Sequence, residues 1–163
     1  MSVASASVNP VSDDYLTVIP TDPWWQPAEE AAERAAAVVA ALLPDRDGGG
    51  EQEVTWHDTV EVVTCGQNLE RIRCPGCGAD LSMRWWGREV TLRQEEGFTT
   101  LGAAPPCCGV ETSLNDLVYD WPCGFARFEI DVLCPERGPL SARELARVAE
   151  ALGHPVRQIL SRF

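Results

Sequence analysis

The clearest alternation of polar and apolar residues lies at positions 124–133, in the stretch "GFARFEIDVL". Charged residues at 127, 129 and 131 alternate there with apolar residues at 126, 128, 130 and 132. Such alternation is typical of a β-strand that is buried on one face only. The stretches "YLTVIP" and "VRQILSRF" also predict strands, and "VTWHDTVEVVTC" predicts one from about Thr59 to Thr64, after a loop over "DRDGGGEQE".

The first predicted helix lies in "TDPWWQPAEEAAERAAAVVAALLPD". Thr21 or Asp22 is the expected N-cap, and prolines follow near the start. Glu29 and Glu30 would stand in the first turn, where the helix dipole favours negative charge. An alanine-rich body follows, and Pro44 is the expected end of the helix.

A second helix is predicted in "PLSARELARVAEALGHPV". Ser141 is the expected N-cap, and Glu144 stands three residues later, which together form the pattern of a capping box. Gly153 fits the left-handed residue that ends many helices. A histidine just beyond it, His154, would lie where the helix dipole favours its positive charge.

The order of these elements is strand, helix, strand, a central stretch of about 60 residues, then strand, helix, strand. This order predicts an α+β fold of the ferredoxin-like split βαβ type, in which two helices cover one face of a four-stranded antiparallel sheet. We expect residues 1–14 to form a disordered tail, residues 15–163 to form one domain, and residues 66–122 to be an insertion in it. An unrelated α+β arrangement with a helical C-terminal segment stays open.

Composition narrows the possible functions. The 163 residues fit a single domain and carry a formal net charge of −12. Every basic residue is an arginine, so a P-loop lysine and a lysine Schiff base are both excluded. Residues 1–66 hold 12 acidic side chains against 2 arginines. This charge argues against a nucleic-acid groove and suits a basic protein partner.

Seven cysteines raise the question of what the thiols do. The start "MSVASASVNPVSDD" lacks the basic and apolar regions of a signal peptide, and no apolar run is long enough to span a membrane. We therefore expect a cytoplasmic location. In that compartment thiols serve metal binding or core packing more often than disulfides.

Four cysteines form the predicted metal site. Cys74 and Cys77 lie in "CPGCG", which is similar to the knuckle of zinc ribbons and rubredoxin-like sites, whereas a redox role would call for an adjoining βαβ pattern. Cys107 and Cys108 follow 30 residues later in "PPCCG". The stretch 81–106 would then be the hairpin of a zinc-ribbon-like insertion.

Adjacent ligands are unusual, because neighbouring side chains of an extended chain point to opposite faces. A tight turn at Gly109, after two prolines, would bring both thiols to one ion. Four thiolates leave no position for water, so the predicted cofactor is a structural Zn²⁺ and no residue is assigned as catalytic. A different fourth ligand, or no metal, stays open; the candidates for that ligand are Cys65, Cys123, Cys134, His57 and His154.

The other cysteines, the tryptophan pairs and one polar segment can each be given a structural or a functional role. Cys65, Cys123 and Cys134 are expected to be small buried apolar side chains. The outward members of two tryptophan pairs are candidate anchors of a protein interface; the pairs are Trp24 with Trp25 and Trp85 with Trp86. The segment "ETSLNDLVYDWPCGFARF" predicts a turn capped by Ser113 or Thr112. An enzyme would instead draw an acid and a base from Asn115, Asp116, Tyr119 and Asp120.

Four stretches together carry a resemblance. "IRCPGCG", "PPCCG" and "SLNDLVYDWPCGFARF", with the closing "LGHPVRQI", resemble a group of small bacterial proteins from high-GC genomes that share a zinc-ribbon-like CPxCG…CCG element. Richness in alanine and arginine fits that origin. The resemblance implies no particular activity.

Three classes of function follow. We expect a non-enzymatic, zinc-stabilised acidic domain that binds another protein, as an adaptor, immunity or antitoxin-like component would. The first alternative is nucleic-acid binding through the arginines of the insertion, which are Arg71, Arg73, Arg84, Arg88 and Arg93. The second is a zinc or thiol hydrolase that uses Cys65, Cys107 or Cys123.

Overall fold

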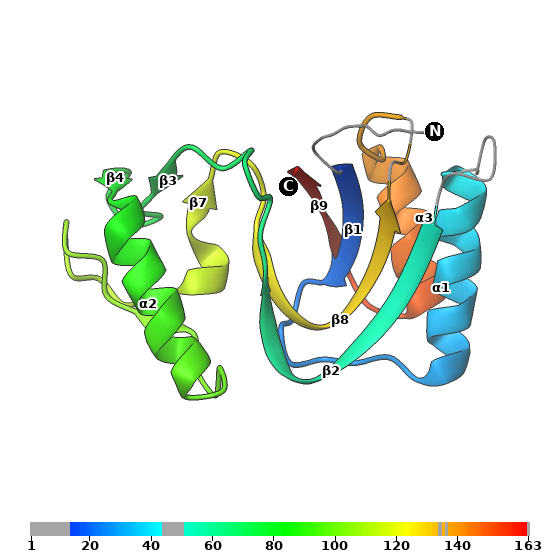
Figure 1. The fold of residues 1–163 in the computed structure, drawn as a ribbon, viewed down its shortest axis with the longest axis horizontal. Coiled ribbons are helices and arrows are strands. Elements are labelled where there is room, and N and C mark those ends of the chain that lie inside the picture. The colour runs from blue at the N-terminus through cyan, green and yellow to red at the C-terminus, as the bar shows by residue number, and fades with distance from the viewer. Residues whose placement is uncertain (1–13, 44–50, 134, 136, 163) are drawn as a thin grey trace, which may run out of the picture.

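The computed structural model describes residues 14–43, 51–133, 135 and 137–162. This part of the chain is mixed α+β, with three α-helices and antiparallel sheets, so the predicted α+β class is confirmed. Figure 1 shows two regions side by side, a four-stranded sheet with two helices and a smaller region built around the third helix. We call them the body and the insertion; the insertion comprises residues 66–122.

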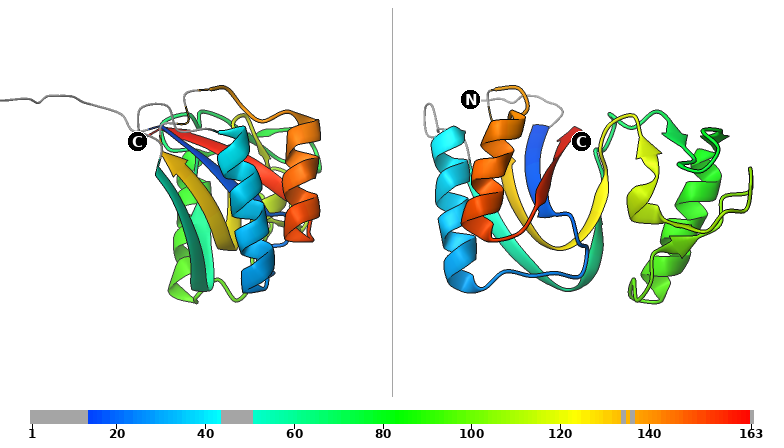
Figure 2. Two further views of the ribbon diagram at one scale, coloured as in Figure 1. Left: turned by 90° about the vertical axis from the view of Figure 1, so that its right-hand side faces the viewer. Right: turned by 180° about the vertical axis from the view of Figure 1, so that it is seen from behind.

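The body contains a sheet in the order β2-β8-β1-β9, and every neighbouring pair is antiparallel. Its strands are β1 (Asp14–Pro20), β2 (Glu51–Val63), β8 (Gly124–Leu133) and β9 (Val156–Arg162). Helices α1 (Glu29–Leu42) and α3 (Ala142–Leu152) cover one face of the sheet (Figure 2). The main core lies between the helices and that face, where it buries Phe128, Ile130 and Val132 of β8.

Strands β2 and β8 are longer than their neighbours and bend strongly (Figure 1). Their pairing register shifts between Trp56 and Glu61, where β2 carries extra residues. A bulge of this kind increases the local bend and twist of a strand. The sheet consequently becomes concave on the side that faces away from the helices.

Two strand boundaries correct the sequence-based prediction. Strand β2 begins at Glu51, whereas residues 51–53 were expected in a loop and the strand only from about Thr59. The loop prediction relied on the nearby glycines, but pairing with β8 holds Glu51 and Glu53 in extended form. The predicted C-terminal strand is confirmed as β9. Of the predicted tail, residues 1–13 lie outside the described residues and Asp14 is the first residue of β1.

The two body helices differ in how well their starts were predicted. At α3 the capping box is present: the Ser141 hydroxyl accepts from the Glu144 amide at 3.1 Å, and Glu144 Oε1 accepts from the Ser141 amide at 2.8 Å. Gly153 ends the helix with φ 85°. The N-cap of α1 was predicted wrongly, because it is Ala28, which makes no side-chain cap. Asp22 instead accepts from the Trp24 amide in the preceding turn.

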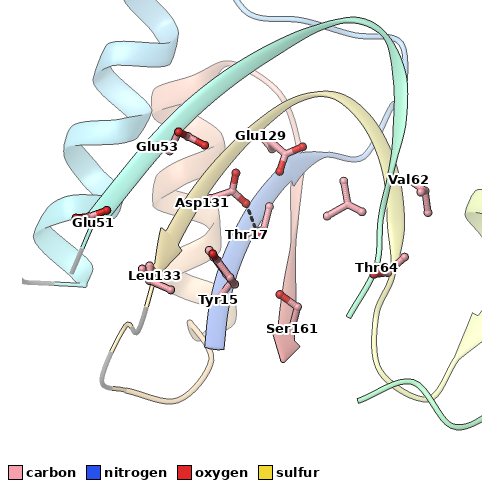
Figure 3. Close-up of a pocket in the computed structure, with 11 residues that line it drawn as sticks. Tyr15, Thr17, Glu51, Glu53, Val62, Thr64, Glu129, Asp131, Leu133 and Ser161 are labelled. Atoms are coloured by element: carbon pink, nitrogen blue, oxygen red, sulfur yellow. Dashed lines mark hydrogen bonds between the residues drawn. The ribbon is translucent and has the colours of Figure 1, made fainter. Parts of the chain in front are cut away.

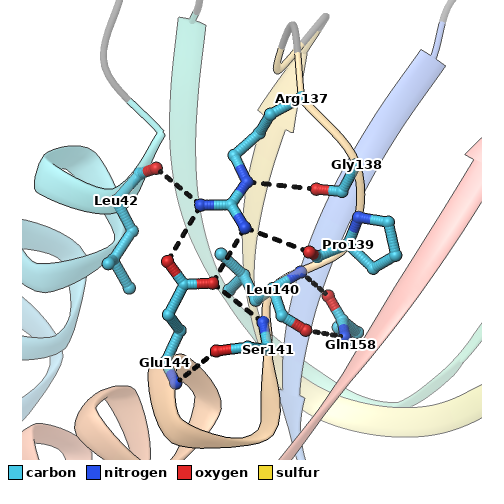
Figure 4. Close-up of polar contacts among 8 residues, drawn as sticks. All are labelled: Leu42, Arg137, Gly138, Pro139, Leu140, Ser141, Glu144 and Gln158. Carbon is cyan, nitrogen blue, oxygen red and sulfur yellow. Dashed lines mark hydrogen bonds and ion pairs between the residues drawn. The ribbon is translucent and has the colours of Figure 1, made fainter.

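Arg137 ties the end of α1 to the start of α3 (Figure 4). Its guanidinium donates to both carboxylate oxygens of Glu144, at 2.8 and 3.0 Å, and to the carbonyl of Leu42 at 3.3 Å. The hydrogen bonds from Arg137 lower the pKa of Glu144 to about 2. The same carboxylate thereby serves the capping box and the contact between helices.

The insertion contains short strands and one helix. Strands β3 (Ile72–Arg73), β4 (Asp80–Leu81) and β7 (Val118–Tyr119) form a sheet in the order β4-β3-β7, and β5 (Gly102–Ala103) pairs with β6 (Thr112–Ser113). Helix α2 (Met83–Glu95) occupies half of the stretch 81–106, which was expected to be a hairpin, so that expectation was wrong. The Ser82 hydroxyl accepts from the amides of Arg84 and Trp85 and thereby caps the helix.

An apolar cluster joins the insertion to the body. It combines Val60 of β2 and Phe125 of β8 with buried side chains from across the insertion. The rings of Phe98 and Phe125 lie 5.8 Å apart, and the Trp24 indole donates to the Phe98 carbonyl at 3.3 Å. The insertion therefore has apolar packing of its own and does not depend on a metal alone. No helix among the described residues is long and apolar enough to cross a membrane.

Candidate metal centre

Two turns with the same backbone hydrogen bond present the four cysteines of the predicted site. In the first, the Gly78 amide donates to the Cys74 carbonyl at 2.9 Å, and in the second the Gly109 amide donates to the Pro105 carbonyl at 2.9 Å. Gly78 has φ 77° and Gly109 has φ 70°. Only glycine adopts this conformation without strain, so the two glycines set the shape of both turns.

Matching the two turns explains the doubled cysteine. Cys77 and Cys108 each stand directly before the left-handed glycine and occupy equivalent positions. In the second turn, Pro105 stands where the first has Cys74, and the thiol missing there is supplied by Cys107 two residues later. The second turn therefore has the shape of the first, but its first cysteine stands two residues later. As a result, the adjacent thiols of Cys107 and Cys108 both lie beside Cys74 and Cys77.

The sulfur atoms of Cys74, Cys77, Cys107 and Cys108 all lie within 4.8 Å of one another. The separation is 3.3 Å between Cys77 and Cys107 and 3.7 Å between Cys74 and Cys108. Four sulfurs bound tetrahedrally at the usual zinc–sulfur length would be separated by about 3.8 Å. The four cysteines could therefore hold a metal ion, and the predicted set is brought together as a whole.

The backbone and the neighbouring thiols shift the acidities within this cluster in opposite directions. Hydrogen bonding from the backbone amide of Cys77, and further from that of Gly76 at 3.3 Å, lowers the pKa of Cys74 to about 7. The neighbouring sulfur of Cys77 raises the pKa of Cys107 to about 12. The protein alone favours one thiolate and opposes further ones, so full ionisation of the cluster requires a cation.

The cluster is anchored on one side and accessible on the other. Cys74 is only 2% exposed and belongs to the apolar cluster of the insertion, whereas the other three cysteines are exposed. An ion bound here would link the turn between β5 and β6 to the buried part of the insertion. Its position at the surface leaves a path for the metal to enter.

The other candidate ligands lie elsewhere. Among the described residues, the cluster of four cysteines is the only group of three or more ligand-type side chains close enough to share an ion. His57 Nε2 contacts Glu129 at 2.7 Å, and the His154 ring stacks on Trp25 with centroids 4.3 Å apart. Cys134 lies outside the described residues.

Cys65 and Cys123 are buried, as expected for small apolar residues, and lie next to each other. Their sulfur atoms are 3.3 Å apart in a cluster with Ile19 and Ile159 of the body. Burial raises the pKa of both thiols. The two residues directly flank the insertion, where the chain enters and leaves it. Burial keeps both thiols in the unreactive protonated form.

The predicted interface tryptophans have different surroundings. Trp85 is buried, and Trp86 is half-buried with its indole donating to the Tyr119 hydroxyl at 3.0 Å. Trp25 is half-buried against His154, which leaves Trp24 as the exposed member of the four at 44%. Two tryptophans outside the predicted set are similarly exposed, Trp56 at 43% and Trp121 at 40%.

The polar segment 112–120 connects parts of the structure. Ser113 caps a single 3₁₀ turn over Leu114–Asp116, as predicted, by accepting from the Asn115 amide. The Asn115 side chain donates to the Thr21 carbonyl at 3.3 Å, and Asp120 accepts from the amides of Glu70 and Trp121. Tyr119 donates to the Leu114 carbonyl at 2.6 Å. These bonds fix Asn115, Tyr119 and Asp120 within the fold, although the buried Oδ1 of Asn115 has no partner among the described residues.

Sequence reasoning missed a cavity of about 650 Å³ on the concave face of the body sheet (Figure 3). Four carboxylates line it, those of Glu51, Glu53, Glu129 and Asp131. Burial, and then the neighbouring Glu129, raise the pKa of Asp131 to about 7. The alternation in β8 predicted that Glu129 and Asp131 share one face of the sheet. Because residues 51–53 were assigned to a loop, the sequence did not predict that Glu51 and Glu53 lie on the same face.

Neither a family model nor a curated protein nor a solved structure matches this chain. Any function has therefore to be argued from the residues and their geometry.

Proposed function

We propose that this chain is a non-enzymatic protein-binding domain whose insertion is stabilised by a structural Zn²⁺. The observation that carries the metal assignment is the convergence of four thiol sulfurs, from two turns, within 4.8 Å. Zinc is the ion that most commonly takes four thiolates tetrahedrally, and such a site has no position left for a substrate or a water molecule. The metal's role is then to hold the two turns together.

We also propose that the body has the ferredoxin-like arrangement. Its elements run strand, helix, strand and again strand, helix, strand, and its sheet order of β2-β8-β1-β9 agrees with that topology. The insertion between the second and third of these strands is zinc-ribbon-like only in its two cysteine turns, because α2 separates them.

The binding role is supported by charge. A net charge of −12, carried largely by the body, favours association with a basic protein. An adaptor, immunity or antitoxin-like component located in the cytoplasm would have these properties. In the segment 112–120, from which an enzyme would draw its acid and base, the side chains of Asn115, Tyr119 and Asp120 each make a hydrogen bond within the fold.

The metal assignment is tested by elemental analysis of protein purified without chelators. We expect one zinc per chain, and loss of that zinc in Cys77→Ser, Cys107→Ser and Cys108→Ser. The matched control is Cys123→Ser, a thiol outside the cluster, which should keep its zinc. Folded wild-type protein free of metal, or zinc retained by all three variants, contradicts the assignment.

The binding role is tested by capture from the native host. We expect the tagged wild-type chain to recover one stoichiometric protein partner at mild salt. Recovery of no protein would count against the proposal. Gel shifts with random RNA and DNA at about 50 mM salt address the nucleic-acid alternative, and we expect no shift, because net negative charge repels phosphates.

A fast-reacting thiol in the zinc-loaded protein would favour the thiol hydrolase instead. Titration with a thiol reagent should show Cys65 and Cys123 unreactive in the folded chain, because both are buried and protonated.

A further inference from the structure

The outer edge of β2 has no strand neighbour among the described residues. β2 pairs with β8 alone, and it is the outermost strand of the body sheet (Figure 2). An open edge of this length presents a row of backbone donors and acceptors to which another chain can pair. The two faces of β2 beside this edge differ sharply in chemistry.

The concave face beside the edge is acidic. Glu51 and Glu53 are exposed at the rim of the 650 Å³ cavity, and Glu129 and Asp131 are half-buried on the neighbouring strand (Figure 3). Glu53 lies directly opposite Asp131 in the strand register. Like charges in such positions destabilise a sheet, and no arginine lines the cavity. His57 contacts Glu129 at 2.7 Å, whereas no basic side chain among the described residues forms an ion pair with Glu51 or Glu53. A positively charged ligand would reduce the remaining repulsion.

The carboxylates of this cavity are not arranged as a metal site. Among the described residues, only the four cysteines come together as a group of three or more ligand-type side chains. The acidic residues instead recur at every second position of two strands, a spacing of roughly 6.7 Å. Positive charges at alternate residues of an extended peptide have the same spacing.

The opposite face beside the same edge is apolar. A cavity of about 690 Å³ lies between α1 and β2, and Ala32, Ala36, Val54 and Trp56 line it, with Glu29 and Glu33 at its border. Trp56 is 43% exposed there. Charged residues alone would protect an edge strand from aggregation, but they do not account for an exposed indole beside a cavity.

We propose that an extended segment of a partner protein, in which basic residues alternate with apolar ones, adds to β2 as a fifth strand. Its backbone pairs with the open edge, its basic side chains lie over the acidic cavity, and its apolar side chains enter the cavity at Trp56. A second copy of this chain does not fit, because it would place Glu51 and Glu53 against an equally acidic edge. The inference rests on the proposed protein-binding function and names its site.

The probe is a nine-residue peptide that alternates arginine with valine, carrying a fluorescent label. Its affinity for the zinc-loaded full chain is measured by fluorescence anisotropy at about 50 mM salt. A peptide of the same composition with its arginines in one block should bind at least tenfold more weakly. N-methylation of one alternate set of residues should abolish binding and that of the other set should not, because only one set faces the strand edge.

Variants of the chain locate the site. The double substitution Glu51→Gln with Glu53→Gln should lower the affinity for the alternating peptide five- to tenfold, and Trp56→Ala should lower it about tenfold. The matched controls are Glu95→Gln with Glu96→Gln, an exposed acidic pair on the insertion, and Trp121→Ala, an indole of similar exposure. Both controls should bind as the wild type does.

Equal binding of the blocked and alternating peptides, or equal losses in the controls and the site variants, overturns the proposal. Dimers of the wild type that disappear in Trp56→Ala would assign the edge to a second copy and overturn it as well. If the native partner is captured equally by wild type and site variants, the binding function stands and this site is wrong. If the variants lose the peptide but wild type captures no partner, the site stands and the adaptor role is wrong.

Discussion

The body and the insertion are built by different means. The body has strands of 7 to 13 residues that pair along their length, with two helices over one face. The insertion has strands of two residues, one α-helix and four cysteines in two turns. A long sheet gains stability from many cooperative hydrogen bonds and a continuous core, whereas isolated short strands gain little. The comparison explains why an ion held by the four cysteines would contribute most in the insertion, where backbone pairing is sparse.

The largest expected effect comes from removing the ion. Chelation of the zinc-loaded protein, or the substitution Cys74→Ser, should lower amide hydrogen-exchange protection in β3, α2 and β7 by at least a hundredfold. A hundredfold loss corresponds to about 2.7 kcal/mol. That is a fraction of the roughly 10 kcal/mol that metal binding contributes to folding in small zinc domains. Protection in β1 and β8 should change little. Equal loss of protection in both regions would mean that they fold as one unit. Cys65→Ser, a buried thiol outside the cluster, is the control for substitution itself.

Two phenylalanines of β8 belong to different cores, so their substitution can test whether the cores are independent. Phe128 and Phe125 are both fully buried, but Phe128 packs against α1 and α3 whereas Phe125 packs in the cluster of the insertion. Either substitution to alanine should cost about 3–5 kcal/mol in the free energy of unfolding. Only Phe125→Ala should also weaken zinc affinity in a competition assay with a chelating dye. Equal effects on zinc affinity would contradict a division into two cores.

Asp131 should make the stability of the body depend on pH. Its folded pKa of about 7 exceeds the ordinary value of 3.8, chiefly because of burial, so the folded chain holds the proton more tightly than the unfolded chain does. The contribution of the Asp131 carboxyl group to stability is then greatest below about pH 4 and is lost as the pH rises through about 7. Asp131→Asn should raise the free energy of unfolding at pH 8 by about 1–3 kcal/mol, a range that allows for the partial exposure of the carboxylate.

The measurement is urea denaturation of wild type and Asp131→Asn at pH 4 and pH 8. The two chains should approach equal stability at pH 4. A variant that is less stable than wild type at pH 8 would show that the hydrogen bond from Thr17 to Asp131 outweighs the cost of burying the charge.

The smallest expected effects come from two helix caps, one in each region. Ser141→Ala removes the cap of α3 and Ser82→Ala that of α2, and each should cost about 1 kcal/mol. Far-UV circular dichroism during urea denaturation should report Ser141→Ala as a shift of the main transition. Ser82→Ala should appear chiefly as faster hydrogen exchange in α2. A main transition shifted equally by both would show that the two regions unfold together.

The sequence predicted well wherever the signal was local. The alternation of β8, the capping box at Ser141 and the left-handed Gly153 all follow from residues close together in the chain, and all three are confirmed. The four cysteines were also found, because each turn carries its own glycine and its own thiols. What failed was the segment between them, where Ser82 was the available signal for a helix and was overlooked.

The α+β class, the helix α3 and the two cysteine turns could be predicted from the sequence, because short-range sterics, capping and turn formation depend on neighbouring residues. Which surfaces face one another depends on the tertiary structure. Glu51 and Glu53 meet Glu129 and Asp131 across a strand pair that joins positions more than 70 residues apart. Pairing over such distances depends on the packing of the whole sheet, which a local pattern does not record.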